Sequence, residues 1–228
     1  MFDKRGWLDD PADFHPHPPA LDDGEIRSGR GRAAGWHYEI LSFDSGFEPP
    51  EDTPGRDRYL AYDSCREAHA WVMRGAAGAP WLICMHGLGM GVPWIDLKVF
   101  PVSLLREELG FNLLFPVMPM HGPRRRFPVS GRGFIAGDVM DTINAVSQAI
   151  WDVRRWLSWL RAGEPAPIGV FGVSMGGYAA ALLSGLDEDL DCAIPGIPAT
   201  DIASLLWWHS STDAIEASAR KGLTLPLD

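Results

Sequence analysis

A serine lies between two glycines where two apolar segments of the chain meet. The segment GVSMG (residues 172–176) fits the pattern G-x-S-x-G, with the strand-like run PIGVFGV before the serine and the alanine-rich run MGGYAAALLSGL after it. In a strand-to-helix turn, glycines at the flanking positions avoid collisions with the neighbouring strand and helix. Such a turn exposes the serine hydroxyl as a nucleophile, with the positive end of the following helix near the developing negative charge. The alternative is a glycine turn in which Ser174 is a small polar filler.

A second segment, MHGLG (residues 85–89), follows an earlier strand-like run and can return a backbone N–H over the serine. A tetrahedral oxyanion needs two N–H donors aimed at one oxygen, and the loss of one donor costs on the order of 10²–10³ in rate. We assign these donors to the amides of Leu88 and Met175. His86 is interpreted as a structural residue that steadies the loop, and not as the base.

Alternating strand and helix patterns position these segments. Residues 137–163 repeat apolar side chains at steps of three and four, which predicts one buried helix face, and residues 175–186 predict another helix. Residues 96–110 predict a helix interrupted by Pro101. Strands alternating with helices predict a doubly wound, mostly parallel α/β sheet with right-handed crossovers. The runs that predict its buried strands are WLICMHG, FNLLFPVMP, PIGVFGV and DCAIPGIP.

The chain before residue 81 follows a different pattern. Residues 1–35 are rich in Asp, Pro, Gly and Arg and show neither a helical nor a strand period, which predicts an irregular segment. The runs WHYEILSF, RYLAYDS and AHAWVMRG predict three early strands that pair antiparallel. We therefore expect an irregular N-terminal segment (1–35), an α/β core (36–200) and the start of a helical cap or lid (201–228).

Composition excludes several classes of function. The formal net charge of −10 disfavours nucleic acid and anionic membranes as partners, and no run approaches the roughly 18 apolar residues that span a bilayer. Three cysteines at unrelated spacings indicate neither a metal site nor a disulfide framework, and they fit a reducing cytoplasm. His15 and His17, in the run HPHPP, are more typical of a solvated segment than of metal ligands. We expect no metal and no organic cofactor.

HGLG after one strand and GVSMGG two strands later resemble the serine-hydrolase branch of the α/β-hydrolase superfamily, over roughly residues 36–205. HGLGMG and MPMHGPRRR look most like poorly characterised bacterial members. The resemblance implies an α/β-hydrolase fold. It also implies nucleophilic acyl chemistry through an acyl-enzyme on Ser174, with a small-molecule ester, thioester or amide as substrate and no cofactor.

In this family an acid and then a histidine follow the serine along the chain, on loops after later strands. Only one histidine, His209, and one convincing strand-like run follow Ser174. Three explanations stay open: a chain that lacks the C-terminal part of the fold, a short enzyme that uses His209 with Asp201 or Asp213, or a non-catalytic binding domain. The alternative role for His209 is a polar position on a cap helix.

Two further segments belong near the same sheet edge. The loop MHGPRRRFP brings Arg124, Arg125 and Arg126, which either recognise an acidic group of the substrate or form a solvated loop. His121 in this loop could reach the site, but it precedes the serine and does not match the family position of the base. Trp207 and Trp208, in the amphipathic stretch after residue 200, either line an apolar substrate pocket or pack on the sheet.

A sheet that lacks its last strands exposes an unpaired apolar edge. On the first of the three explanations, we therefore predict that the 228-residue chain alone is marginally stable or oligomeric. Size-exclusion chromatography with light scattering, followed by a thermal melt, tests this. A monodisperse monomer with one sharp cooperative transition would contradict it.

Overall fold

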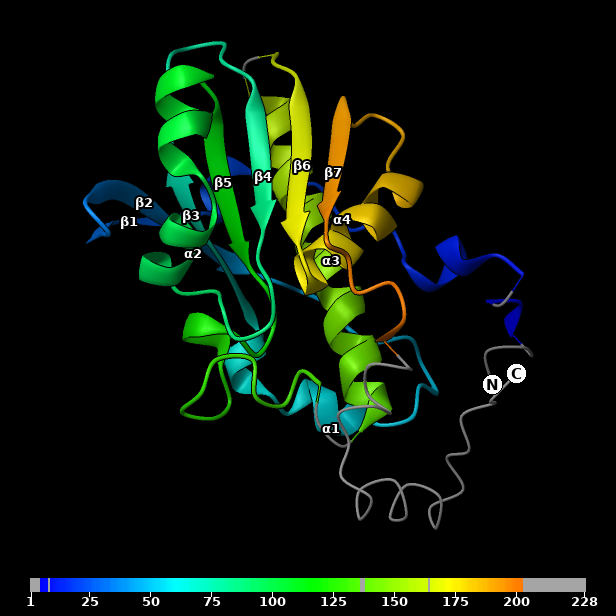
Figure 1. Ribbon diagram of the computed structural model, residues 1–228. Helices are drawn as coiled ribbons and strands as arrows, with labels where there is room; N and C mark the ends of the chain where they lie inside the picture. The colour runs from blue at the N-terminus through cyan, green and yellow to red at the C-terminus, as the bar shows by residue number, and fades with distance from the viewer. Residues whose placement is uncertain (1–4, 8, 136–137, 164, 203–228) are drawn as a thin grey trace.

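The computed structural model describes residues 5–7, 9–135, 138–163 and 165–202. In this part of the chain a mixed sheet has the strand order β1-β2-β3-β5-β4-β6-β7 (Figure 1). The strands are β1 (Arg27–Ala33), β2 (Trp36–Asp44), β3 (Glu67–Met73), β4 (Trp81–Met85), β5 (Asn112–Val117), β6 (Ile168–Val173) and β7 (Cys192–Gly196). The α-helices are α1 (Arg56–Leu60), α2 (Pro93–Val99), α3 (Val139–Ala162) and α4 (Met175–Leu186).

Strands β5, β4, β6 and β7 run parallel, whereas β1, β2 and β3 extend the sheet by antiparallel pairing that reaches β5. Helices cover both faces of the sheet. Ile83 and its neighbours pack with α3 and α4 in one cluster, and Leu82 and its neighbours pack with α2 and the turn after it in the other. The predicted doubly wound, mostly parallel α/β sheet is confirmed. The expected incompleteness and the predicted cap concern chain outside the described residues and stay predictions.

The structure differs from the sequence prediction in two places before β3. Residues 58–64 were predicted as a strand, but they form part of α1 and a 3₁₀ turn at Asp63–Cys65. The reason is the docking of two buried tyrosines, Tyr59 in α1 and Tyr62 just after it, on α3. Tyr59 donates a hydrogen bond to Gln148 and Tyr62 donates one to Asp141, so both side chains dock on α3.

The second difference is β1, which lies inside the segment predicted to be irregular. Its sequence, RSGRGRA, carries no large apolar side chain, so no hydrophobic alternation marks it as a strand. Backbone pairing with β2 forms it instead, from Arg27 opposite Ser42 to Ala33 opposite Trp36. The connecting residues, Ala34 and Gly35, both have positive φ, as two-residue hairpin turns of the tightest type require.

Helix α3 is buried on more than the one apolar face that its periodicity predicts. The chain before β1 and the chain between β2 and α1 lie over its outer side. The helix therefore buries polar side chains as well, and each needs a partner. Arg155 bonds the carboxylate of Glu25, and Gln148 donates to the carbonyl of Cys65.

Arg124, from the arginine run expected either to bind substrate or to be solvated, is fully buried instead. It donates hydrogen bonds to the carbonyls of Val117 and Cys65 and lies 2.9 Å from the carboxylate of Asp152 on α3. Burial raises the pKa of Asp152, and the Arg124 guanidinium opposes that rise. This ion pair therefore joins the loop after β5 to α3.

We predict that Arg124→Met lowers the free energy of unfolding by about 3–5 kcal/mol near pH 8, because it leaves the Asp152 carboxylate buried without its cation. The pKa of Asp152 in the folded variant lies above its unfolded value, so stability falls as pH rises toward that folded pKa. The deficit is therefore smaller at lower pH, where the carboxyl can bind a proton. Urea unfolding at two pH values measures both effects. Arg125→Met, at an exposed neighbouring position, is the control, and equal stability of the two variants would contradict the prediction.

Candidate active site

Ser174 is the single residue between the end of β6 and the start of α4. Its backbone angles are φ 57° and ψ −116°, a conformation that residues other than glycine rarely adopt. Its N–H donates to the carbonyl of Gly196, and its own carbonyl accepts from the amides of Tyr178 and Ala199. Hydrogen bonds from both β7 and α4 therefore hold this strained residue in place.

The flanking glycines permit a close approach of backbone to backbone. A Cβ at Gly172 would overlap the carbonyl of Gly176, and a Cβ at Gly176 would overlap the carbonyl of Met85 at the end of β4. The first turn of α4 consequently lies directly against the carboxyl end of β4. The sequence-based explanation of these glycines is confirmed.

The loop after β4 passes beside the serine. A Cβ placed on Gly87 would lie 3.5 Å from the Cβ of Ser174 and 3.3 Å from the carbonyl oxygen of Val173. Among the described residues, the backbone N–H groups of Leu88 and Met175 donate no hydrogen bond to another protein group. The assignment of these two amides as oxyanion donors stays a prediction. The closeness of Gly87 to the strand-to-helix turn at Ser174 supports it.

His86 is completely buried and both ring nitrogens are engaged. Nδ1 lies 2.9 Å from the carbonyl oxygen of Gly87, and Nε2 accepts a hydrogen bond from the amide of Met118. Burial lowers the pKa of His86 to about 4, so the ring is neutral near pH 7. It connects the loop after β4 to the loop after β5, which agrees with the structural role expected from the sequence.

His121 packs edge-on against His86, with ring centroids 4.8 Å apart. Its Nδ1 lies 2.9 Å from the carbonyl oxygen of Pro119, and burial lowers its pKa to about 3. A general base works best when its pKa is close to the working pH, so His121 is poorly suited to remove a proton from serine.

The sequence did not single out two other side chains that hold the loop after β4. Ser130 donates a hydrogen bond to the carbonyl of Met90, and Asp96 accepts one from the amide of Gly91 at 2.9 Å. Ser130 lies in a long loop and Asp96 in an apolar helix. No motif marks either residue.

Asp201 is exposed and follows β7, two residues after the amide that donates to the carbonyl of Ser174. His209, Asp213, Trp207 and Trp208 lie outside the described residues. The roles predicted for Asp201 and His209 stay predictions. In the arginine run that begins at Arg124, the next residue, Arg125, donates a hydrogen bond to the carbonyl of Gly122.

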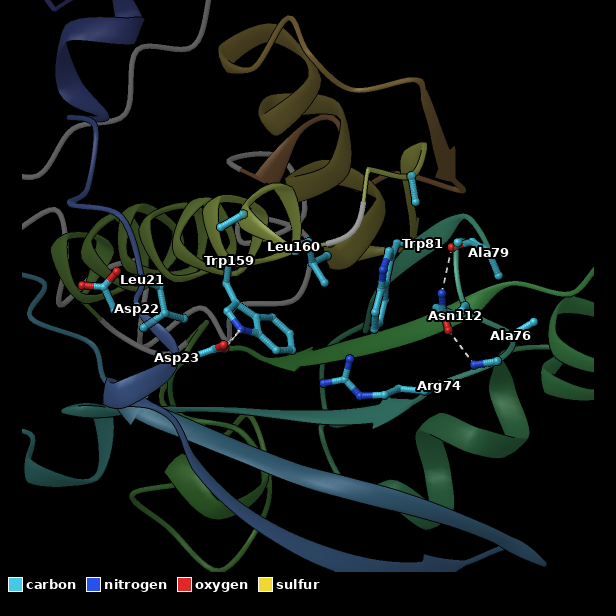
Figure 2. Close-up of a pocket in the computed structure, with 16 residues that line it drawn as sticks. Leu21, Asp22, Asp23, Arg74, Ala76, Ala79, Trp81, Asn112, Trp159 and Leu160 are labelled. Carbon is cyan, nitrogen blue, oxygen red and sulfur yellow. Dashed lines mark hydrogen bonds between the residues drawn. The ribbon is translucent and has the colours of Figure 1, made fainter.

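A cavity of about 790 Å³ lies at the opposite end of the sheet, where β4 and β5 begin (Figure 2). Its polar groups are satisfied by protein partners. Asn112 bridges Gly75 and Ala79, and Arg74 donates to Glu39 outside the cavity. Within the cavity the Arg74 guanidinium lies over the rings of Trp81 and Trp159, and Trp159 donates to Asp23. These contacts explain the residues as packing, far along the strands from Ser174.

Neither a metal cluster nor a membrane-spanning helix occurs in the part of the chain that the structure describes. No three His, Cys, Asp or Glu side chains there lie close enough to hold a metal ion. No helix there is long and apolar enough to cross a bilayer.

No protein-family model matches the chain. Two uncharacterized proteins of Mycobacterium tuberculosis, from the strains CDC 1551 / Oshkosh and ATCC 25618 / H37Rv, are each 42% identical to it over 210 residues. The match covers 92% of this chain and 50% of each relative, so the chain spans about half the length of the curated relatives it matches. The structure of an acetyl xylan esterase from Paenibacillus sp. R4 is similar, with a TM-score of 0.51 and 16% sequence identity. That similarity covers 93% of this chain and 71% of the esterase, and at this identity it concerns the fold alone.

The close approach of α4 to β4 yields a prediction for two glycines of the same helix. Gly176→Ala should prevent folding or lower the free energy of unfolding by more than about 3 kcal/mol, because its Cβ meets rigid backbone. Gly185→Ala is the control: a Cβ there meets nothing within 4 Å, and alanine should stabilise the helix by about 0.5–1 kcal/mol. Denaturant unfolding of both variants measures the effects. Similar stability of the two would contradict the described packing of α4.

Proposed function

The chain has the α/β-hydrolase fold, and on that premise we propose that it is a serine hydrolase. It cleaves an ester, thioester or amide bond of a small molecule through an acyl-enzyme on Ser174. The observation that carries this proposal is the strained conformation of Ser174 at the start of α4, with Gly87 packed beside it. Backbone strain of this kind costs about 1–3 kcal/mol, persists only where the surrounding structure enforces it, and clusters at active sites.

The reaction begins when a histidine base removes the Ser174 proton and the serine oxygen attacks the carbonyl carbon of the substrate. The amides of Leu88 and Met175 donate hydrogen bonds to the tetrahedral oxyanion, and the N-terminal end of α4 adds its positive potential. The intermediate then expels the leaving group, which takes the proton from the histidine. Water, activated by the same base, finally releases the acyl group and restores the serine.

The base comes from outside the described residues. His86 and His121 are neutral, buried and bonded to backbone carbonyls, so neither is free to shuttle a proton. Within the sequence the candidate is His209, oriented by Asp201 or Asp213. Asp201 lies on the segment that follows β7, beside the backbone of Ser174, which supports its choice as the acid.

Among the three bond types, we favour an ester, and the acetyl xylan esterase of similar fold supports this choice. We also propose a reducing, cytoplasmic location. The location is supported by three free thiols, those of Cys65, Cys84 and Cys192. The net negative charge of the chain makes nucleic acid a poor partner.

The decisive experiment is labelling of the purified chain with a fluorophosphonate probe, with mass spectrometry to locate the adduct. We predict modification of Ser174 in the parent chain and none in Ser174→Ala, with ester turnover reduced by roughly 10⁴-fold or more. The melting temperature of Ser174→Ala should match that of the parent, because among the described residues the Ser174 hydroxyl makes no capping hydrogen bond to α4.

His209→Ala tests the base in the same assay and should also abolish labelling. A parent chain that is never labelled would contradict the proposed activity of this chain and would leave two of the explanations above: a chain that lacks the C-terminal part of the fold, or a non-catalytic binding domain. Labelling that survives in His209→Ala would instead reject only that histidine.

A further inference from the structure

The loop between β4 and α2, residues 86–92, carries the amide assigned to the oxyanion. His86 and Ser130 fix two of its carbonyls from one side. On the side of α2, Oδ1 of Asp96 accepts the N–H of Gly91 at 2.9 Å. This side chain therefore joins the end of the loop to the helix that follows it, in addition to the backbone hydrogen bonds that the amides of Ile95 and Asp96 donate to the carbonyl of Val92.

Gly91 is the point at which the loop is wedged. Its φ is +79°, and a Cβ there would lie 2.8 Å from the Cβ of His121 and 2.9 Å from Nε2 of His86. One side of Gly91 therefore meets the two imidazole rings, while its N–H points to Asp96. A shift of Gly91 away from the carboxylate would move the preceding residues, which include Leu88.

The surroundings of Asp96 are unusual for an acidic residue in the first turn of a helix. The side chain is 1% exposed, and its other oxygen, Oδ2, accepts the indole N–H of Trp71 at 3.1 Å. Among the described residues no lysine or arginine forms an ion pair with it, and burial raises its pKa to about 7. A buried charge without a cation is costly, and a neutral asparagine could also accept the N–H of Gly91.

We propose that Asp96 is a positioning residue that holds the 86–92 loop in the conformation that presents its amides to the oxyanion, and that it does so fully only as a carboxylate. The inference rests on the proposed hydrolase function. A carboxylate accepts hydrogen bonds at both oxygens, so Gly91 and Trp71 are bound together. A protonated carboxyl carries one O–H, and one of the two N–H groups then faces a donor.

The change in Asp96 falls within an accessible pH range, because its pKa is about 7. The titratable groups that face it or pack against Gly91 are Cys84, His86 and His121. Burial raises the pKa of the Cys84 thiol well above its usual range and lowers those of His86 and His121 to about 4 and about 3. None of the three changes charge between about pH 6 and pH 8. In this range the loop therefore responds to Asp96.

The test compares fluorophosphonate labelling rates of the parent and Asp96→Asn across pH. Asparagine resembles the protonated carboxyl, since it has one acceptor oxygen and one donor group. The ratio of parent to variant rates should be about tenfold near pH 8.5 and should fall to within about twofold near pH 5.5. Titration of the catalytic base affects both proteins and cancels in the ratio. If Asp96 only stabilised α2, the ratio of parent to variant rates would not change with pH, and that result would overturn the proposal.

Trp71→Phe is the matched control, because it removes the competing donor and leaves Asp96 and Gly91 in place. Trp71→Phe should be labelled at the parent rate at high pH. At low pH its labelling rate should fall less than that of the parent, since the one acceptor oxygen of the protonated carboxyl is enough for Gly91 alone. A decline as steep as in the parent would argue against competition for the carboxyl.

A second measurement does not depend on a reactive serine. Hydrogen exchange with mass spectrometry on a peptide that spans residues 86–92 should show faster exchange in Asp96→Asn than in the parent at high pH. A peptide over residues 168–180 should be unchanged. A loop that responds in a chain that is never labelled would contradict the proposed activity of this chain and leave the positioning of the loop intact. A labelled chain whose loop and rate ratio do not respond would refute the positioning alone.

Discussion

The site depends on one steric constraint, the contact between the first turn of α4 and the carboxyl ends of the neighbouring strands. Gly176 meets the carbonyl of Met85, and Gly177 meets the carbonyl of Gly196, so the helix lies on β4 and β7 without side chains between them. This leaves one residue to turn the chain from β6 into α4. That residue, Ser174, must accept a positive φ, and hydrogen bonds with β7, with the segment after β7 and with α4 keep it there. The position of Ser174 is thus a consequence of backbone packing.

A second consequence concerns the loop after β4, which lies beside Ser174. Because α4 is tight against β4, the loop that leaves β4 must pass beside Ser174, and Gly87 has no side chain to keep it away. The loop is then braced by the chain that leaves β5, through His86 and Ser130, while that chain is itself fastened to α3 by the buried pair of Arg124 and Asp152. Contacts that run from α3 to the loop therefore support its geometry in the absence of substrate.

The parts of the fold that the sequence predicts are those whose side chains record their burial. Strands β4, β5 and β6 lie in the parallel part of the sheet and read as short apolar runs, and the long periodic stretch predicts α3. Strand β1 could not be found in this way, since backbone pairing forms it without any apolar face. The burial of Arg124 was equally hidden, because the partner that makes it tolerable lies on α3, far along the chain.

The site divides in a similar manner. Ser174 and its glycines carry a motif, because the steric requirement acts on adjacent residues and leaves a local signature. Asp96 and Ser130 carry none, since each acts on a backbone group brought near by folding. Sequence reasoning therefore finds Ser174 more readily than the residues that hold the neighbouring loop in place.

Burial also separates two electrical tasks at this edge of the sheet. Stabilising an oxyanion requires fixed dipoles that do not change with pH, and the buried rings of His86 and His121 stay neutral for that reason. Proton transfer requires the opposite, a group whose pKa lies near the working pH and whose ring nitrogen can reach the serine. In the proposed mechanism the loops after β4 and β5 serve the first task. In the proposed mechanism the second task falls to chain beyond β7, which begins against the backbone of Ser174 and contains Asp201 and His209.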